Sequence, residues 1–330
     1  MISGLIWIFT ARCNLACKHC YVVPRMSSVR ELPLHEKLEL IDQAHELGIE
    51  YIGFSGGEPL IHPHFFKLVE RCYEYGVETS VVTNGIALSE EVARRLARLE
   101  VYVNVSLDGP DRESHEGLRG PGTWERVLEG IEALKTAGAE FSTVLAIYPG
   151  NYSKAGDYVR FVRELGLDRA SMIPVMNAGR SRDSGLAIGA KEYLKAIELA
   201  TSVAEECGLH LSLWCTPFAP LVARKSKISC WSCRLSDVAD LDPGGRLLLC
   251  DVIDVVISSV EGKGLRTALE EFERHPLVLE ISDPPVLPRE CEECPIAWYC
   301  RGGCYARALL ERRSLRGADP LCPRVAGLLG

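Results

Sequence analysis

A chain of 330 residues is long enough for one large domain and a small one, and 47% hydrophobic residues supply a substantial core. The net charge of -8 argues against general nucleic-acid binding, which requires a clustered basic face. No apolar run reaches the roughly 18 residues of a membrane helix, and the N-terminal stretch has no secretory pattern, so we expect a cytoplasmic protein without membrane contact.

Six strand-like segments alternate with helix-like segments over residues 1–215. The strand-like segments are 5–9, 51–55, 77–83, 101–107, 141–147 and 169–175. The helix-like segments are 34–48, 63–75, 89–99, 122–137, 153–165 and 190–207. This alternation predicts an α/β fold with a parallel sheet and right-handed crossovers. Because a closed barrel needs about eight units, we predict an open or partial barrel with functional residues on the loops that follow the strands.

The composition of the chain changes over residues 216–330, where prolines, glycines and cysteines accumulate. Residues 242–252 predict a turn that enters a strand, and residues 264–275 predict a short helix. The rest is loop-rich. Eight cysteines in a region of this size indicate a small domain organised around metal rather than around a large apolar core.

The fourteen cysteines of the chain indicate metal binding or catalysis if the protein is intracellular. An even number also permits disulfides, but nothing else in the sequence indicates export. Three of the cysteines form the stretch "CNLACKHC" directly after the first predicted strand: Cys13, Cys17 and Cys20. Three thiolates suit zinc or an iron–sulfur cluster with one iron left open, and an open position is typical of a catalytic metal.

This C-x3-C-x2-C motif in the first βα loop resembles the radical S-adenosylmethionine (SAM) superfamily. In that family three cysteines hold a 4Fe–4S cluster, and SAM chelates the unique iron through its amino and carboxylate groups. The reduced cluster cleaves SAM to a 5′-deoxyadenosyl radical, which abstracts hydrogen from a substrate. The resemblance therefore implies a radical SAM oxidoreductase with a partial (β/α)6 barrel over residues 1–215.

Three further segments extend the resemblance, each after a predicted strand: "GGEP" at 56–59, "SLDG" at 106–109 and "HEGLRG" at 115–120. By resemblance, the first binds the methionine amino group, the second lies near the ribose, and an arginine of the third meets the SAM carboxylate. The fork of a guanidinium matches a carboxylate. The SAM-binding residues so implied are Gly56, Gly57, Glu58, Ser106, Asp108 and Arg119.

Two features of this region add no metal ligand and no identified adenine contact on strand five. His19 lies between cluster cysteines and is interpreted as a ring packed near the adenine rather than as a metal ligand. The glycine-rich pattern that many members carry on strand five is absent from "STVLAIYPG". No adenine contact is therefore inferred there.

The C-terminal cysteines resemble a SPASM extension, which carries auxiliary 4Fe–4S clusters, and imply three clusters in all. By resemblance, one set forms auxiliary cluster I: Cys230, Cys233, Cys250 and Cys304. The other set forms auxiliary cluster II: Cys291, Cys294, Cys300 and Cys322. Cys230 lies outside the seven-cysteine pattern of the family, and without it cluster I has an open iron.

Other interpretations of the cysteines remain open. A zinc ribbon would use the two C-x2-C pairs at 230–233 and 291–294, and would leave four cysteines of this region unexplained. Cys72, Cys207 and Cys215 match no pattern and are expected to be buried structural thiols.

Closed auxiliary clusters carry electrons and so favour a net oxidation or bond formation. Asp251 follows a predicted cluster ligand and is either the base that removes a substrate proton or a structural carboxylate. The resemblance favours a peptide or protein substrate, with sulfatase-maturase-like chemistry included. The alternatives are an enzyme of haem, tetrapyrrole or other small-molecule cofactor synthesis, and a non-enzymatic iron–sulfur or zinc scaffold.

The partners implied are a peptide, protein or small-molecule substrate and an electron donor such as ferredoxin or flavodoxin. Many peptide maturases carry a peptide-binding domain before the cluster motif, whereas twelve residues precede Cys13. A separate peptide-binding protein is therefore expected, or recognition by the core itself.

Overall fold

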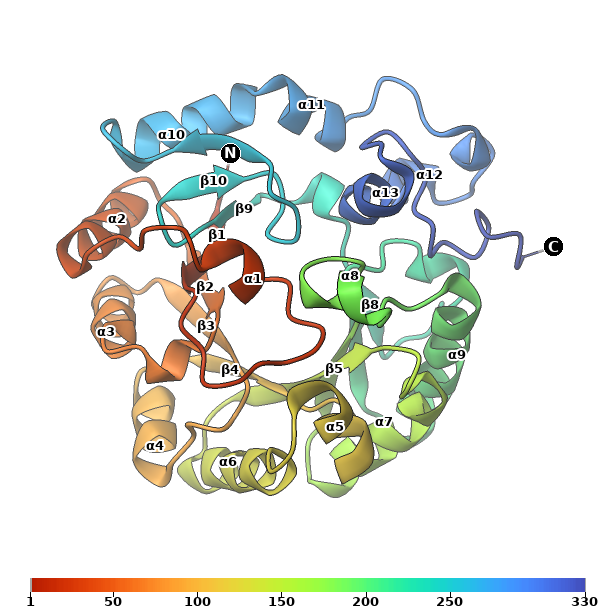
Figure 1. Cartoon of the computed structure of the whole chain (residues 1–330), viewed down its shortest axis with the longest axis horizontal. Coiled ribbons are helices and arrows are strands. Elements are labelled where there is room, and N and C mark those ends of the chain that lie inside the picture. The colour runs from red at the N-terminus through yellow and green to blue at the C-terminus, as the bar shows by residue number, and fades with distance from the viewer. Residues whose placement is uncertain (1, 330) are drawn as a thin grey trace.

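The computed structural model describes residues 2–329, which wrap helices around a strongly curved sheet (Figure 1). The sheet has eleven strands in the order β11-β10-β9-β1-β2-β3-β4-β5-β6-β7-β8. The strands are β1 (Gly4–Thr10), β2 (Tyr51–Gly56), β3 (Glu78–Thr83), β4 (Tyr102–Ser106), β5 (Phe141–Ile147), β6 (Arg169–Pro174), β7 (His210–Leu213), β8 (Ile228–Cys230), β9 (Val238–Leu241), β10 (Arg246–Leu248) and β11 (Val256–Ser259).

The helices lie outside the sheet or over the ends of its strands (Figure 1). The α-helices are α1 (Val23–Met26), α2 (Leu34–Glu46), α3 (Phe65–Glu74), α4 (Glu90–Arg98), α5 (Arg112–Arg119), α6 (Trp124–Ala137), α7 (Ala155–Glu164), α8 (Arg180–Ser184), α9 (Ala190–Cys207), α10 (Gly264–Arg274), α11 (Pro276–Ser282), α12 (Ala297–Cys300) and α13 (Tyr305–Arg312). The 3₁₀ turns are η1 (Pro59–Ile61), η2 (Tyr152–Lys154), η3 (Ala219–Leu221), η4 (Cys233–Leu235) and η5 (Arg289–Cys291). None of the helices within 2–329 is both long and apolar enough to cross a bilayer.

The predicted α/β alternation is confirmed by the order of the strands. Strands β1 to β6 are parallel neighbours in chain order, as right-handed βα crossovers require. Their apolar runs are buried on both faces, which is typical of parallel strands covered by helices. The sheet is not closed, since β8 and β11 form its two edges.

The chain after residue 216 extends the same sheet at both ends. β8 pairs with β7, and β9 pairs in parallel with β1, followed by antiparallel β10 and β11. The sequence predicted the turn and strand near β10 but missed β7, β8, β9 and β11, which are only three or four residues long. Because β9 adds to β1, the cysteine-rich region lies against the strand that leads into the first cysteine loop.

Candidate active site

Cys13, Cys17 and Cys20 lie on one loop between β1 and α1, which crosses the open end of the barrel (Figure 1). Burial raises the pKa of the Cys13 thiol, and the nearby thiols of Cys17 and Cys20 contribute to the shift. Backbone amides already point at two of the sulfurs. Leu15 N lies 3.4 Å from Cys13 Sγ, and Val23 N lies 3.4 Å from Cys20 Sγ. The loop therefore gathers three thiols with donors suited to thiolates.

The backbone of Gly56 and Gly57 packs directly against the start of this cysteine loop. Gly57 N donates to Thr10 O at 2.9 Å, and Glu58 N donates to Arg12 O at 2.8 Å. A Cβ atom on Gly57 would lie 2.1 Å from Arg12 O. Gly56 has a positive φ of 134°, where a side chain would also be strained. These glycines are required because two backbone segments touch here.

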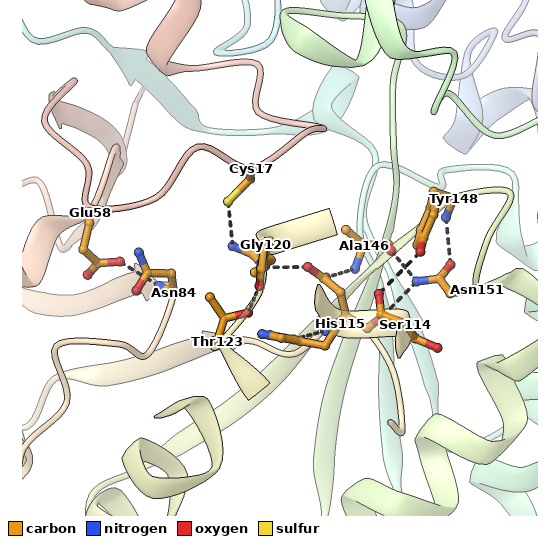
Figure 2. Close-up of polar contacts among 12 residues, drawn as sticks. Cys17, Glu58, Asn84, Ser114, His115, Gly120, Thr123, Ala146, Tyr148 and Asn151 are labelled. Carbon is orange, nitrogen blue, oxygen red and sulfur yellow. Dashed lines mark hydrogen bonds and ion pairs between the residues drawn. The ribbon is translucent and has the colours of Figure 1, made fainter. Parts of the chain in front are cut away.

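Glu58 turns its carboxylate into the protein rather than toward the cysteines. It is fully buried and accepts hydrogen bonds from Thr83 Oγ1 at 2.7 Å, Asn84 N at 2.7 Å and Leu60 N at 3.1 Å. Burial raises the pKa of Glu58, although these donors oppose the shift. Its carboxylate thus joins the loop after β2 to the end of β3, and Figure 2 shows the contact with Asn84.

Asp108 and Arg119 form a buried ion pair beside the cysteine loop. Arg119 Nε donates to Asp108 Oδ2 at 2.5 Å, and its Nη1 lies 3.9 Å from Cys17 Sγ. Burial opposes ionisation of Asp108, but Arg119 and two neighbouring histidines outweigh it and lower the pKa of Asp108. The same pairing raises the pKa of Arg119 against the effect of burial. A permanent cation is therefore held next to a cluster cysteine.

Asp108 is itself fixed by the loops after β4 and β5. Its Oδ1 accepts from Ala146 N at 2.8 Å, and Asn151 Nδ2 donates both to the Asp108 carbonyl and to the Ala146 carbonyl. His115 Nδ1 accepts from Asp108 N at 3.2 Å. Figure 2 labels three of these partners, His115, Ala146 and Asn151. Asn151, which the sequence did not predict, follows β5 and links the loops after β4 and β5.

A cavity of about 550 Å³ inside the barrel joins the two functional regions of the sequence. His19 and Tyr21 of the cysteine loop line it, as do Ser106, Asp108 and Arg119. Residues from the C-terminal region also line it: Cys233, Asp240, Cys250, Asp251 and Tyr305. Of the implied SAM residues, Ser106, Asp108 and Arg119 line the cavity. The GGEP segment instead supports the cysteine loop through its backbone.

Asp251 faces this cavity and makes direct contact with the cysteine loop. Its Oδ2 accepts a hydrogen bond from Tyr21 OH at 2.6 Å, and its backbone amide donates to Asp240 Oδ2 at 2.9 Å. Burial raises the pKa of Asp251, and Tyr21 and Arg25 oppose that shift. Tyr21 and Asp240 were not predicted, although Tyr21 directly follows Cys20 in the sequence.

The structure places Cys230 apart from the cavity that Cys233 and Cys250 line. Cys230 ends β8 and faces Tyr299, whose hydroxyl lies 3.6 Å from its sulfur. Beyond burial, only Tyr299 shifts the pKa of Cys230. β8 pairs with β7, so this thiol is held at the sheet edge.

Cys215, which the sequence left outside both auxiliary groups, lies in the region of Cys233 and Cys250. It follows β7 and lines the same cavity as Cys233 and Cys250. Burial raises the pKa of Cys215 well above its usual value, and Cys233 and Cys304 raise it further. Cys215, Cys250 and Cys304 also pack around one apolar cluster. The four thiols that lie together come from distant parts of the chain, so no short motif could have found Cys215.

The four cysteines that the sequence grouped as auxiliary cluster II lie close together. Cys291, Cys294, Cys300 and Cys322 line one small cavity. Burial raises the pKa of Cys291 to about 12, and Cys322 and Cys294 contribute. A zinc ribbon would require the cysteine pairs at 230–233 and 291–294 to lie together. The structure instead places Cys233 and Cys291 at different cavities.

The donor sets fit the groups that the sequence implies. Three thiols on the first loop leave a cluster with an open position, while two groups of four thiols suit closed clusters. Near the three-cysteine loop, Arg119 supplies a cation for a carboxylate.

Comparisons with known proteins identify a family and several similar chains. Residues 7–162 match the family described as "Radical SAM superfamily". The AdoMet-dependent heme synthase of Methanosarcina barkeri is 26% identical over 96% of this chain and 95% of its own. The mycofactocin maturase MftC of Mycobacterium ulcerans is 27% identical over 96% and 87%. Streptococcus suis SuiB, solved with its precursor peptide SuiA, has the same fold, with a TM-score of 0.77 at 17% identity over 98% of this chain and 76% of SuiB.

The α/β fold and the family match over residues 7–162 indicate an enzyme that uses SAM and a 4Fe–4S cluster. Residues 7–162 form a radical SAM domain, and the protein is a radical SAM oxidoreductase with the mycofactocin maturase MftC among its relatives.

Proposed function

We propose that the protein modifies a peptide or protein, with two auxiliary 4Fe–4S clusters accepting electrons. The observation that carries this is the cavity of about 550 Å³ that runs from the cysteine loop to Cys250 and Asp251. Cys13, Cys17 and Cys20 would hold the first cluster, which supplies reductive cleavage of SAM when both are bound. Gly56 and Gly57 hold that loop in place, and Arg119 orients the SAM carboxylate.

The charges around the cavity favour a peptide over a tetrapyrrole. Asp237, Asp240 and Asp251 line it, and its lining cation Arg119 is already paired with Asp108. Burial raises the pKa of Asp240 and Asp251, which limits their negative charge. A tetrapyrrole that bears several carboxylates would still bring further acidic groups to this wall, whereas a neutral or basic peptide segment would not. The mycofactocin maturase and SuiB among the similar proteins support the same choice. The tetrapyrrole alternative, which the heme synthase relative supports, is the less favoured one.

The residues near the C-terminal cysteines have defined tasks in this proposal. Cys215, Cys233, Cys250 and Cys304 would bind cluster I, and Cys291, Cys294, Cys300 and Cys322 would bind cluster II. Asp251 would take the proton released when the substrate radical is oxidised, and Tyr21 would hold its carboxylate. An external donor such as ferredoxin or flavodoxin would supply electrons. A separate peptide-binding protein, or the core itself, would present the substrate.

The test uses full-length protein reconstituted anaerobically with iron and sulfide, then reduced in the presence of SAM. Peptides encoded beside the gene are added, and both 5′-deoxyadenosine and the mass of each peptide are measured. Formation of 5′-deoxyadenosine with a peptide mass change supports the proposal. Conversion of a tetrapyrrole but of no peptide supports the alternative, and no 5′-deoxyadenosine under any condition supports a non-enzymatic scaffold.

A further inference from the structure

Arg307 is a buried cation between the two auxiliary cysteine groups. It lies on α13, three residues after Cys304, and its side chain is 1% exposed. Burying a charged side chain is costly unless partners inside the protein compensate it. The contacts of this guanidinium therefore indicate what the site is built to hold.

Three of the five N–H groups of Arg307 have partners. Nε donates to Asp319 Oδ1 at 2.9 Å, and Nη2 donates to Asp319 Oδ2 and to the Cys215 carbonyl, both at 2.6 Å. Asp319 also accepts from Cys304 N at 3.0 Å, and its own carbonyl accepts from Cys322 N at 3.0 Å. The ion pair thus contacts backbone of cysteines from both auxiliary groups.

Nη1 of Arg307 is buried and has no hydrogen-bond partner among residues 2–329. A charged donor left unsatisfied in the interior is rare and expensive, so such an atom indicates a partner other than the chain. Besides Asp319, the groups that act on the charge of this guanidinium include the thiols of Cys304 and Cys215. Burial lowers the pKa of Arg307, but Asp319, Cys304 and Cys215 together outweigh it and hold the pKa well above its usual value.

We propose that Nη1 of Arg307 donates a hydrogen bond to a sulfur of auxiliary cluster I and makes that cluster easier to reduce. A cluster bound by four thiolates carries net negative charge, which grows by one when it accepts an electron. Hydrogen bonds to sulfur and nearby positive charge both favour the reduced state. The inference rests on the proposed cluster I, but it needs neither substrate nor SAM cleavage. Arg307 is a positioning residue that acts through the cluster.

The test is a redox titration of anaerobically reconstituted full-length protein, followed by electron paramagnetic resonance. Replacing Cys13, Cys17 and Cys20 by Ala removes the first cluster, so that two auxiliary signals remain. The signal that disappears with Cys233→Ala belongs to cluster I. In this background Arg307→Gln should lower the potential of cluster I by about 59 mV or more, which is a tenfold weaker reduction equilibrium for one electron.

Asp319→Asn provides a change of opposite sign, because it removes the anion that neutralises Arg307 and should raise the same potential. Arg313→Gln is the matched control, since Arg313 directly follows the same helix and is exposed. This variant should shift the potential of neither auxiliary cluster. Iron and sulfide counts are taken for every variant. If Arg307→Gln does not retain cluster I, the potential of cluster I is measured in Arg307→Lys and Asp319→Asn instead.

An unchanged cluster I potential in iron-replete Arg307→Gln would overturn the inference and leave Arg307 a structural residue. A shift of the same sign in Asp319→Asn would also overturn it. Absence of cluster I from the unmodified protein would instead overturn the proposed function, so the two failures are distinguishable.

Discussion

The Tyr21 hydroxyl donates a 2.6 Å hydrogen bond to Asp251, and each of these residues directly follows a cysteine in the sequence. Tyr21 comes after Cys20 of the first loop, and Asp251 comes after Cys250 of the C-terminal region. One hydrogen bond therefore connects the backbone segments that hold two of the proposed clusters, across the cavity between them.

Asp251→Asn should block product formation while hydrogen abstraction continues, because an amide cannot accept the substrate proton. General-base removal predicts a loss of product of about 100-fold or more. With a peptide that the protein converts, 5′-deoxyadenosine reports hydrogen abstraction and mass spectrometry reports product. Asp254→Asn, at an exposed position in the same segment, is the control. If both rates stay normal in Asp251→Asn, Asp251 is a structural carboxylate held by Tyr21.

Cys13→Ala, Cys17→Ala and Cys20→Ala should each abolish SAM cleavage, because two thiolates cannot retain the cluster. The measurement is 5′-deoxyadenosine formed by reduced, iron-replete protein. Cys207→Ala serves as the control, since Cys207 ends α9 away from the cavity and should leave cleavage unchanged. Cleavage retained in any of the three loop variants would contradict the proposed site.

Cys215→Ala and Cys230→Ala form a matched pair that tests the proposed ligand set. Three 4Fe–4S clusters give about twelve irons per chain. Cys215→Ala should lose up to about four of them, whereas Cys230→Ala should lose none, because its thiol contacts Tyr299. Iron and sulfide analysis after anaerobic reconstitution decides between them. The opposite result would restore Cys230 to cluster I, and about four irons in the unmodified protein would exclude both auxiliary clusters.

Asp108→Asn should weaken both the fold and SAM binding. It leaves Arg119 as an uncompensated buried cation, which typically costs about 3–5 kcal/mol of unfolding free energy. Asp157→Asn breaks an exposed ion pair with Arg160 and should cost no more than about 1 kcal/mol. Denaturant unfolding measures the first effect and equilibrium dialysis of SAM the second. Equal stability of the two variants would show that the Arg119 pair contributes little.

His62 should make the protein less stable in mild acid. Burial and then Lys37 lower the pKa of His62 to about 4, from an ordinary value near 6.5. Between these two pH values the unfolded chain binds a proton that the folded chain does not, so stability falls as the pH is lowered. At pH 5 the loss approaches about 2 kcal/mol relative to neutral pH.

Unfolding measured at pH 7 and at pH 5 tests this contribution. His62→Gln should lose less stability between the two values than the unmodified protein. His35→Gln is the control, because the His35 side chain is 78% exposed and should not change the difference. An unchanged pH dependence in His62→Gln would assign the acid sensitivity to other groups.

The sequence predicted the features that local patterns encode. The six βα units are found, and cysteines grouped by short spacings lie on one loop or line one small cavity, since apolar periodicity and short cysteine spacings are local signals. Cys215, Asp240 and the Arg307–Asp319 pair were missed because they are brought together only by the tertiary fold. β9 was missed for the same reason, as its four residues are stabilised by pairing with β1.

The shared use of the 300–304 pair sets an order for making the mature protein. In the proposed assignment Cys300 is grouped with Cys322, with which it lines one cavity, while Cys304 is grouped with Cys215, which follows the seventh strand of the barrel. On the proposed assignment, the ribosome releases the ligands of the first cluster early, whereas the first auxiliary group is complete only once Cys304 has been synthesised and the second only once Cys322 has. Iron delivery to the proposed auxiliary sites would then be a late step, and iron-starved cells would accumulate chains whose barrel has formed but whose C-terminal segment is not yet held against it.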